Sequence, residues 1–330
     1  MLRENIGAGG AKENNMEMKQ EGNEVRRGVA PRSDLALATR RFGLYTAALA
    51  LLFCVPLFRL GALSLKEDLY SHVLLMPFVS VYLIWITKHR LPVVVSSSRG
   101  GTVLFAGLGV VALAALAAFA ALGKHLPSND SLALSIGALV CFVVAGVFHL
   151  LGSHVARVAA YPIGLLFFLI PFPSVVRHGL EVALQHSSAE VAYWMLQLAR
   201  VPVLRDGVVF ALPGITIQVA EECSGIRSSF VLFITGLVGG FLFLENLKHR
   251  FWFSILTIPL GIIRNGFRVL TISLLCVHVD PSMIHSAIHH RGGPIFFALS
   301  MIPLFALLFY LRRRELARGV KSAPDNPPPS

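Results

Sequence analysis

Apolar runs alternate with short polar segments along the chain from about residue 42 onward. Eight of these runs come close to the roughly twenty mainly apolar residues that an α-helix needs to cross a membrane. They cover residues 42–62, 70–87, 101–123, 131–151, 156–173, 224–244, 251–276 and 293–312. The pattern therefore predicts an all-α multi-pass membrane protein with about eight transmembrane helices.

The longest polar connection, residues 174–222, has two halves with different periodicity. The first half interleaves apolar with charged and amide residues, which is typical of an amphipathic helix lying in the membrane interface. A ninth span is the alternative interpretation of this half. The second half predicts two short strands, Val208–Leu212 and Ile215–Ala220, joined by a turn at Pro213-Gly214. This hairpin comes directly before the sixth span.

Basic residues gather beside the apolar runs. The clusters are Arg26, Arg27, Arg32, Arg40 and Arg41; Lys88, Arg90 and Arg99; Arg157; Lys248 and Arg250; and Arg312, Arg313 and Arg314. With eight spans, all of them lie on one side, which the positive-inside rule assigns to the cytoplasm. We therefore expect both termini in the cytoplasm and the interfacial helix on the outer face of the cytoplasmic (inner) membrane. A ninth span would put the last two clusters outside, which the rule disfavours.

This topology divides the chain into three parts: a polar cytoplasmic segment, 1–41, expected to be disordered; a transmembrane domain, 42–312; and a basic, Pro-rich cytoplasmic tail, 313–330. The composition agrees, because 55% hydrophobic and 14% charged residues differ from the balance of a soluble globular protein. The net charge of +11 comes from short clusters rather than one basic stripe, so we predict contact with membrane lipid and not with nucleic acid.

A candidate nucleophile lies where the polar connection meets the sixth apolar run. The segment Glu221–Ser229 contains Cys223 followed by Ser224-Gly225, and a helix N-terminus favours the thiolate form of a cysteine. Inert packing of Cys223 and a disulfide with Cys276 are the alternatives. The four cysteines form no CxxC pair or His/Cys spacing, so we predict neither a metal site nor a cofactor.

Three arginines fall within apolar runs near the same outer boundary: Arg227, Arg264 and Arg268. An arginine at the centre of a span costs about 2.5–3.5 kcal/mol on insertion scales, so we expect these three to face a shared interior cavity. Asn265 lies three residues before Arg268, on the same helix face. The alternative is that Arg264 and Arg268 extend to lipid headgroups.

Histidines supply candidate bases at the same depth. His289 begins the segment His289–Gly293 directly before the last span, and His290 is its near neighbour. His72, at the outer start of the second span, is also expected to reach the cavity. Ser224 and Arg227 complete the set of possible supporting residues.

These groups suffice for acyl transfer. Cys223 would attack a peptide carbonyl, Arg268 would stabilise the oxyanion, and His289 would protonate the leaving amine and later activate the acceptor. The expected substrate is an exported protein whose own hydrophobic tail holds its cleavage site at this depth. A multi-pass transporter of an anionic substrate, an intramembrane cysteine protease without transfer, and an inert assembly protein are the other interpretations.

Three motifs carry a resemblance to a known family. Ala220–Ser228 matches A-E-x-C-S-G-x-x-S, Asn265–Arg268 matches N-x-x-R, and His289–Gly293 matches H-x-x-x-G before a final span. Over about residues 42–312 the chain resembles the exosortase/archaeosortase family of membrane transpeptidases. The resemblance implies a Cys-Arg-His site carried by Cys223, Arg268 and His289. It also implies substrates with a C-terminal tripartite sorting signal of the PEP-CTERM type and an unidentified cell-surface acceptor.

Overall fold

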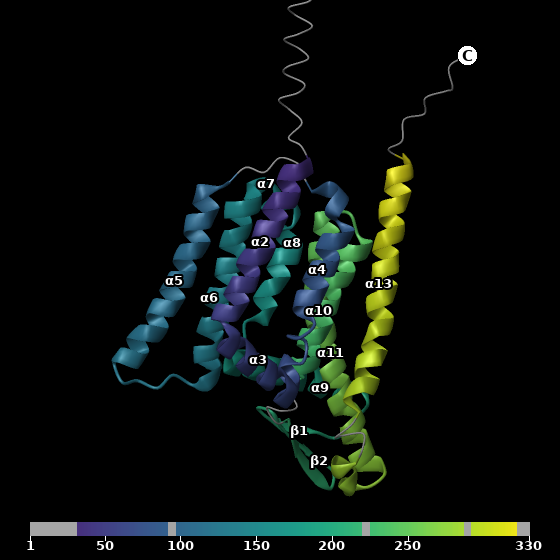
Figure 1. Ribbon diagram of the computed structural model, residues 1–330. Coiled ribbons are helices and arrows are strands. Elements are labelled where there is room, and N and C mark those ends of the chain that lie inside the picture. The colour runs from purple at the N-terminus through teal and green to yellow at the C-terminus, as the bar shows by residue number, and fades with distance from the viewer. Residues whose placement is uncertain (1–31, 92–96, 220–224, 287–291, 322–330) are drawn as a thin grey trace, which may run out of the picture. The chain divides into compact units, whose positions relative to one another are not determined.

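The computed structural model describes residues 32–91, 97–219, 225–286 and 292–321 (Figure 1). Contacts divide the chain into two compact units, Met1–Leu63 with Val73–Pro171 and Ser64–His72 with Phe172–Ser330. The two units are described separately below. The short segment 64–72 belongs to the second unit, although the residues on both sides of it belong to the first.

Within the described ranges, six helical segments are long and apolar enough to cross a membrane. They are Leu35–Leu52, Arg99–Ala121, Ser128–Val158, Ile226–Phe243, Leu247–His278 and Gly293–Ala317, and a seventh results if the interrupted pair Ala160–Leu169 and Ser174–Leu198 counts as one span. The mainly helical, multi-pass architecture is thus confirmed. The count of about eight is not reached on this criterion. The helix in the run 70–87 covers only Met76–Ile86, and the run 156–173 is broken near Pro171 and Pro173.

The first unit contains helices and no strand among its described residues. Its elements are α2 (Arg32–Leu52), α3 (Cys54–Lys66, whose last residues enter the second unit), α4 (Met76–Ile86), α5 (Arg99–Ala121), α6 (Ser128–Gly146), a π-helical turn (Val147–Leu151), α7 (Gly152–Val158) and α8 (Ala160–Leu165). Glycines on α5 admit aromatic rings: a Cβ on Gly101 would lie 2.4 Å from the Phe148 ring, and one on Gly109 would lie 2.9 Å from Phe142. Close helix approach through small residues is typical of packing in lipid.

The second unit carries the candidate site. Its elements are the 3-10 turn η1 (Asp68–Tyr70), α9 (Ser174–Leu198), β1 (Leu204–Asp206), β2 (Val209–Leu212), β3 (Ile215–Gln218), α10 (Ile226–Phe243), α11 (Leu247–His278), η6 (Pro281–His285) and α13 (Gly293–Lys321). One buried cluster joins α9, the sheet and the second half of α11, and includes Leu196, Phe210 and Ile272. Another joins α10, α11 and α13 through Leu232, Phe253 and Leu304.

The three strands form an antiparallel sheet in the order β1-β2-β3. β2 and β3 pair from Leu212↔Ile215 to Val209↔Gln218, and the turn between them uses Gly214 at φ 81°. This confirms the hairpin expected from the sequence. β1 was not predicted; it pairs with β2 across a second tight turn at Gly207 (φ 58°). Ala220, the expected end of the second strand, lies outside the described residues.

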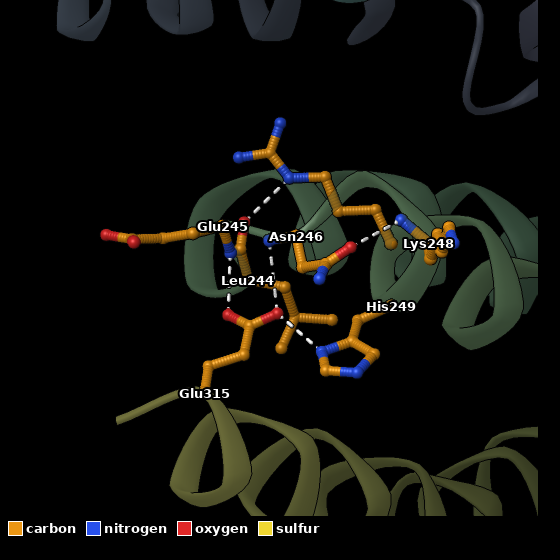
Figure 2. Close-up of polar contacts among 7 residues, drawn as sticks. Leu244, Glu245, Asn246, Lys248, His249 and Glu315 are labelled. Carbon is orange, nitrogen blue, oxygen red and sulfur yellow. Dashed lines mark hydrogen bonds and ion pairs between the residues drawn. The ribbon is translucent and has the colours of Figure 1, made fainter. Parts of the chain in front are cut away.

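A carboxylate on α13 caps the start of α11 (Figure 2). Glu315 Oε2 accepts a hydrogen bond from the backbone N–H of Glu245 at 2.8 Å. Its Oε1 accepts from the backbone N–H of Asn246 at 3.1 Å and lies 2.6 Å from His249 Nδ1. The Asn246 side chain in turn accepts from the backbone N–H of Lys248 at 2.9 Å. A helix start leaves N–H groups without intrahelical partners and favours negative charge. Glu315 therefore holds α13 in register with α11.

Replacing Glu315 with alanine should destabilise the second unit, because it removes the acceptor shared by two backbone N–H groups and His249. We expect the free energy of unfolding to fall by about 1–3 kcal/mol, seen as a lower thermal unfolding midpoint of the purified protein in detergent. Glu245→Ala is the matched control, since the Glu245 carboxylate points away from this cluster (Figure 2). Equal midpoints for the two variants would contradict the cap.

Candidate active site

Small residues bring α10 and α11 together as an antiparallel pair. A Cβ on Gly261 would lie 2.7 Å from Ser229 Oγ, and one on Gly236 would lie 2.5 Å from Thr257 Cγ2. Neither distance is available to a real side chain, so the helix backbones approach more closely than larger residues would allow. This register sets the second half of α11 beside the first turn of α10.

Gly225 forms the junction between the cysteine motif and α11. It is the N-cap of α10 and adopts a left-handed conformation with φ 74°. A Cβ at this position would lie 2.8 Å from Asn265 Cγ and 3.2 Å from Arg264 Nη2. Both the backbone conformation and the space therefore require glycine. Two of the motifs noted in the sequence thus meet at Gly225 and Asn265.

The three arginines occupy different environments. Arg264 is 7% exposed and Asn265 is 2% exposed, so the alternative that Arg264 extends to lipid headgroups is wrong. Arg268, one turn further along α11, is half-buried. Arg227 is exposed and forms an ion pair with Asp68 of η1. Sequence reasoning did not anticipate this partner.

A cavity of about 510 Å³ lies beside these residues. Gly225, Arg227 and Ser228 line it from α10, Arg268 from α11, and Gly293 and Phe297 from α13. Ser71 completes the wall from the segment that follows η1. Arg268 and Arg227 are the positively charged groups among these lining residues, which suits the cavity to an anionic or strongly polarised group.

Four of the predicted site residues lie outside the described residues: Cys223, Ser224, His289 and His290. Their described neighbours are nevertheless informative. Gly225 directly follows Ser224, and Gly293 comes shortly after His290; both glycines line the cavity that Arg268 lines. Gly225 of the cysteine motif and Gly293 of the histidine motif therefore line the same cavity.

His72 lies next in sequence to a cavity-lining residue. It is buried; its Nδ1 lies 3.0 Å from the Leu69 carbonyl oxygen, and its ring meets Phe230 edge-on at 4.9 Å between centroids. Its neighbour Ser71 is the residue that lines the cavity. These contacts hold the segment that carries Ser71 against α10.

Two ion pairs fix the segment 64–72 within the second unit. Besides the pair between Asp68 and Arg227, Glu67 contacts Arg177 of α9 at 3.0 Å, and Arg177 also contacts Glu181 at 3.0 Å. The adjacent acidic residues Glu67-Asp68 before Tyr70-Ser71-His72 were the sequence signal for this arrangement. The signal was missed because its basic partners lie more than a hundred residues away.

A buried glutamine holds the chain just before the cysteine motif. Gln185 of α9 is 6% exposed and donates from Nε2 to the Val219 carbonyl at 2.5 Å. Val219 also donates its N–H to the Val208 carbonyl at 3.0 Å. Nothing in the sequence alone distinguished Gln185 from the other polar residues of α9. Over the part of the chain described here, no three His, Cys, Asp or Glu side chains gather as metal ligands would.

The model of one protein family, transmembrane exosortase (Exosortase_EpsH), matches residues 63–306, which is more than half of the chain. The chain belongs to the transmembrane exosortase family. Membership indicates a membrane transpeptidase or protein-sorting function, and the matched range contains the Cys223, Arg268 and His289 motifs of this exosortase. No curated protein and no solved structure matches the chain.

Replacing Gly225 with alanine should damage both stability and activity of the exosortase. The left-handed conformation costs an L-residue about 1–2 kcal/mol, and overpacking against Asn265 adds about 1–3 kcal/mol. Gly239→Ala on the same helix is the matched control, because the atom nearest to its added Cβ is in Phe253 at an ordinary 3.8 Å. Thermal unfolding of the purified proteins in detergent should separate the two variants, and their activity should follow the same order. Similar behaviour of both would contradict the close contact at Gly225.

Proposed function

We propose that this exosortase is a membrane-embedded cysteine transpeptidase. It cleaves C-terminal sorting signals of exported proteins through a thioester on Cys223 and transfers the processed proteins to a cell-surface acceptor. The observation that carries the proposal is the cavity in which Arg268 lies beside Gly225 and Gly293, the described neighbours of the cysteine and histidine motifs.

Chain length supports this assignment. Consecutive Cα atoms are about 3.8 Å apart, so the Cα of Cys223 is at most about 7.6 Å from that of Gly225, and the Cα of His289 is at most about 15 Å from that of Gly293. Both residues are therefore within reach of the cavity. Arg264 and Asn265 behind Gly225 favour negative charge at this point of the chain, which lowers the cost of a thiolate.

The proposed chemistry has two steps. In the first, the Cys223 thiolate attacks the scissile carbonyl, Arg268 stabilises the oxyanion, and His289 or its neighbour His290 protonates the departing amine. This leaves a thioester on Cys223 and releases the hydrophobic tail. In the second, the same histidine takes a proton from the acceptor nucleophile, which displaces the thiolate. Water as the acceptor would give a protease instead of a transpeptidase.

We place the site at the outer leaflet of the cytoplasmic membrane, with both termini in the cytoplasm. This orientation requires eight passes, so two further crossings, through the short α4 and through the segment 160–169, would have to add to the six long helical segments. α9 then lies in the outer interface. The basic residues Lys248 and Arg250 and the cluster Arg312–Arg314 fall on the cytoplasmic side, as the positive-inside rule favours.

Substitution of Cys223 tests the nucleophile. A reporter protein ending in a short motif, an apolar segment and a basic tail, taken from an exported protein of the same organism, is co-expressed with the exosortase, and tail removal is followed by immunoblot. We expect Cys223→Ala and Cys223→Ser to leave the tail intact, whereas Cys54→Ala and Cys141→Ala process it normally. Continued processing by both Cys223 variants would exclude the mechanism and favour a transporter of an anionic substrate.

The arginines should differ in their effect on processing. Arg268→Ala removes the proposed oxyanion donor and should lower the processing rate at least a hundredfold, the usual effect of losing one such donor. Arg227→Ala leaves Asp68 at the rim without its partner and should have a smaller effect, since exposed ion pairs contribute about 0–1 kcal/mol. Equal rates for these two variants at matched membrane levels would remove the special role of Arg268.

A further inference from the structure

Among the described strands, β3 is an edge strand of the sheet. The Val219 N–H donates to the Val208 carbonyl, and in an antiparallel pair alternate residues direct their backbone groups toward the partner strand. Ile217 and Val219 therefore face β2. Thr216 and Gln218 direct their N–H and C=O groups to the opposite side, where the order β1-β2-β3 places no strand.

These outward groups are suited to pair with another chain. Both residues are exposed, and within the described ranges no hydrogen bond to the backbone of Thr216 or Gln218 is found. The strand is held firmly from its other face, because Ile217 and Val219 belong to the buried cluster with α9 and α11. A rigid strand with an unpaired row of N–H and C=O groups is the template that extended peptides use in β-strand addition.

Along the chain, the edge of β3 comes shortly before the residues that line the cavity. Gln218 precedes Cys223 by only five residues, a distance of at most about 17 Å along the chain. On α11, Val269 packs in the cluster beneath the sheet, whereas the preceding residue, Arg268, lines the cavity. The buried Gln185 anchors Val219 at the point where β3 leads toward the cysteine motif.

We propose that the exported substrate adds an extended strand to the edge of β3, pairing its backbone with Thr216 and Gln218. This inference rests on the proposed function and names how the same site holds its substrate. The paired segment lies on the exported side of the cleavage site, within about five residues of it, because the hydrophobic tail beyond that site enters the membrane. Backbone pairing does not depend on the identity of the side chains, so it would suit exported proteins with different sequences.

Proline substitution isolates the backbone contribution. At residue 216 or 218, proline removes an N–H that β2 does not use, and edge strands tolerate proline at such positions. With purified exosortase and the tailed reporter in detergent, we expect Thr216→Pro and Gln218→Pro each to raise the apparent KM up to about tenfold, the effect of losing one hydrogen bond. The kcat should change little. Thr216→Ala and Gln218→Ala keep the N–H and change only the side chain, so they should raise the KM much less than the proline variants do.

Cross-linking provides a second measurement that does not require an active enzyme. Thr216→Cys in a Cys223→Ala background is combined with single cysteines at successive substrate positions before the apolar segment. A paired strand should give efficient cross-links at every second position, because side chains alternate between faces. Uniform cross-linking along the segment would overturn the proposal. It would also be overturned by proline variants with the KM of the wild type, or by alanine variants whose KM rises as much as that of the proline variants. If Cys223→Ser is inactive and the proline variants behave as wild type, strand addition is refuted and the proposed function stands. If Cys223→Ser is active, the proposed function itself is refuted.

Discussion

The close approach of α10 and α11 is the constraint on which the rest of the site depends. Glycines at 236 and 261 let the two backbones meet where ordinary side chains would hold them apart. The resulting register brings Gly225 onto Asn265 and Arg264 and sets Arg268 at the cavity wall. The polar residues of α11 are thereby covered by protein, which removes the cost of exposing them to lipid. The packing of α10 against α11 thus also determines the positions of the residues at the candidate site.

Two further sets of contacts fix the other walls of the cavity. Glu315 caps the start of α11 and so sets the axial position of α13, whose first turn carries Gly293 and Phe297 at the cavity. At 1.5 Å per residue, the cap lies about 33 Å from Gly293. The segment 64–72 is tied to α9 and α10 by Glu67 and Asp68. Exposed pairs of this kind add little stability, so their main effect is on the position of Ser71.

Local sequence patterns predicted the long helices and the hairpin, whereas contacts between distant segments determine how the residues of the site are arranged. Hydrophobic periodicity found the long helices, and Pro213-Gly214 found the hairpin, because both signals are contained in short stretches of chain. β1 was missed because three residues have no clear periodicity of their own. The partners Asp68 and Arg227, and the contact between Gly225 and Asn265, depend on how distant segments pack. The residues of the cysteine and histidine motifs at 223 and 289 lie outside the described part of the chain, so their roles remain predictions.

The cost of placing charge in the membrane explains only part of the arrangement of the three arginines. The cost of charge in a span predicts that Arg227, Arg264 and Arg268 avoid lipid, but it assigns them no separate roles. In the structure Arg227 is paired with an acidic side chain at the rim, and Arg264 is buried behind Gly225. Arg268 is the α11 arginine on the cavity wall. An oxyanion donor must contact the reacting carbonyl, so the position of Arg268 on the cavity wall, more than its charge, makes it the candidate for the proposed role.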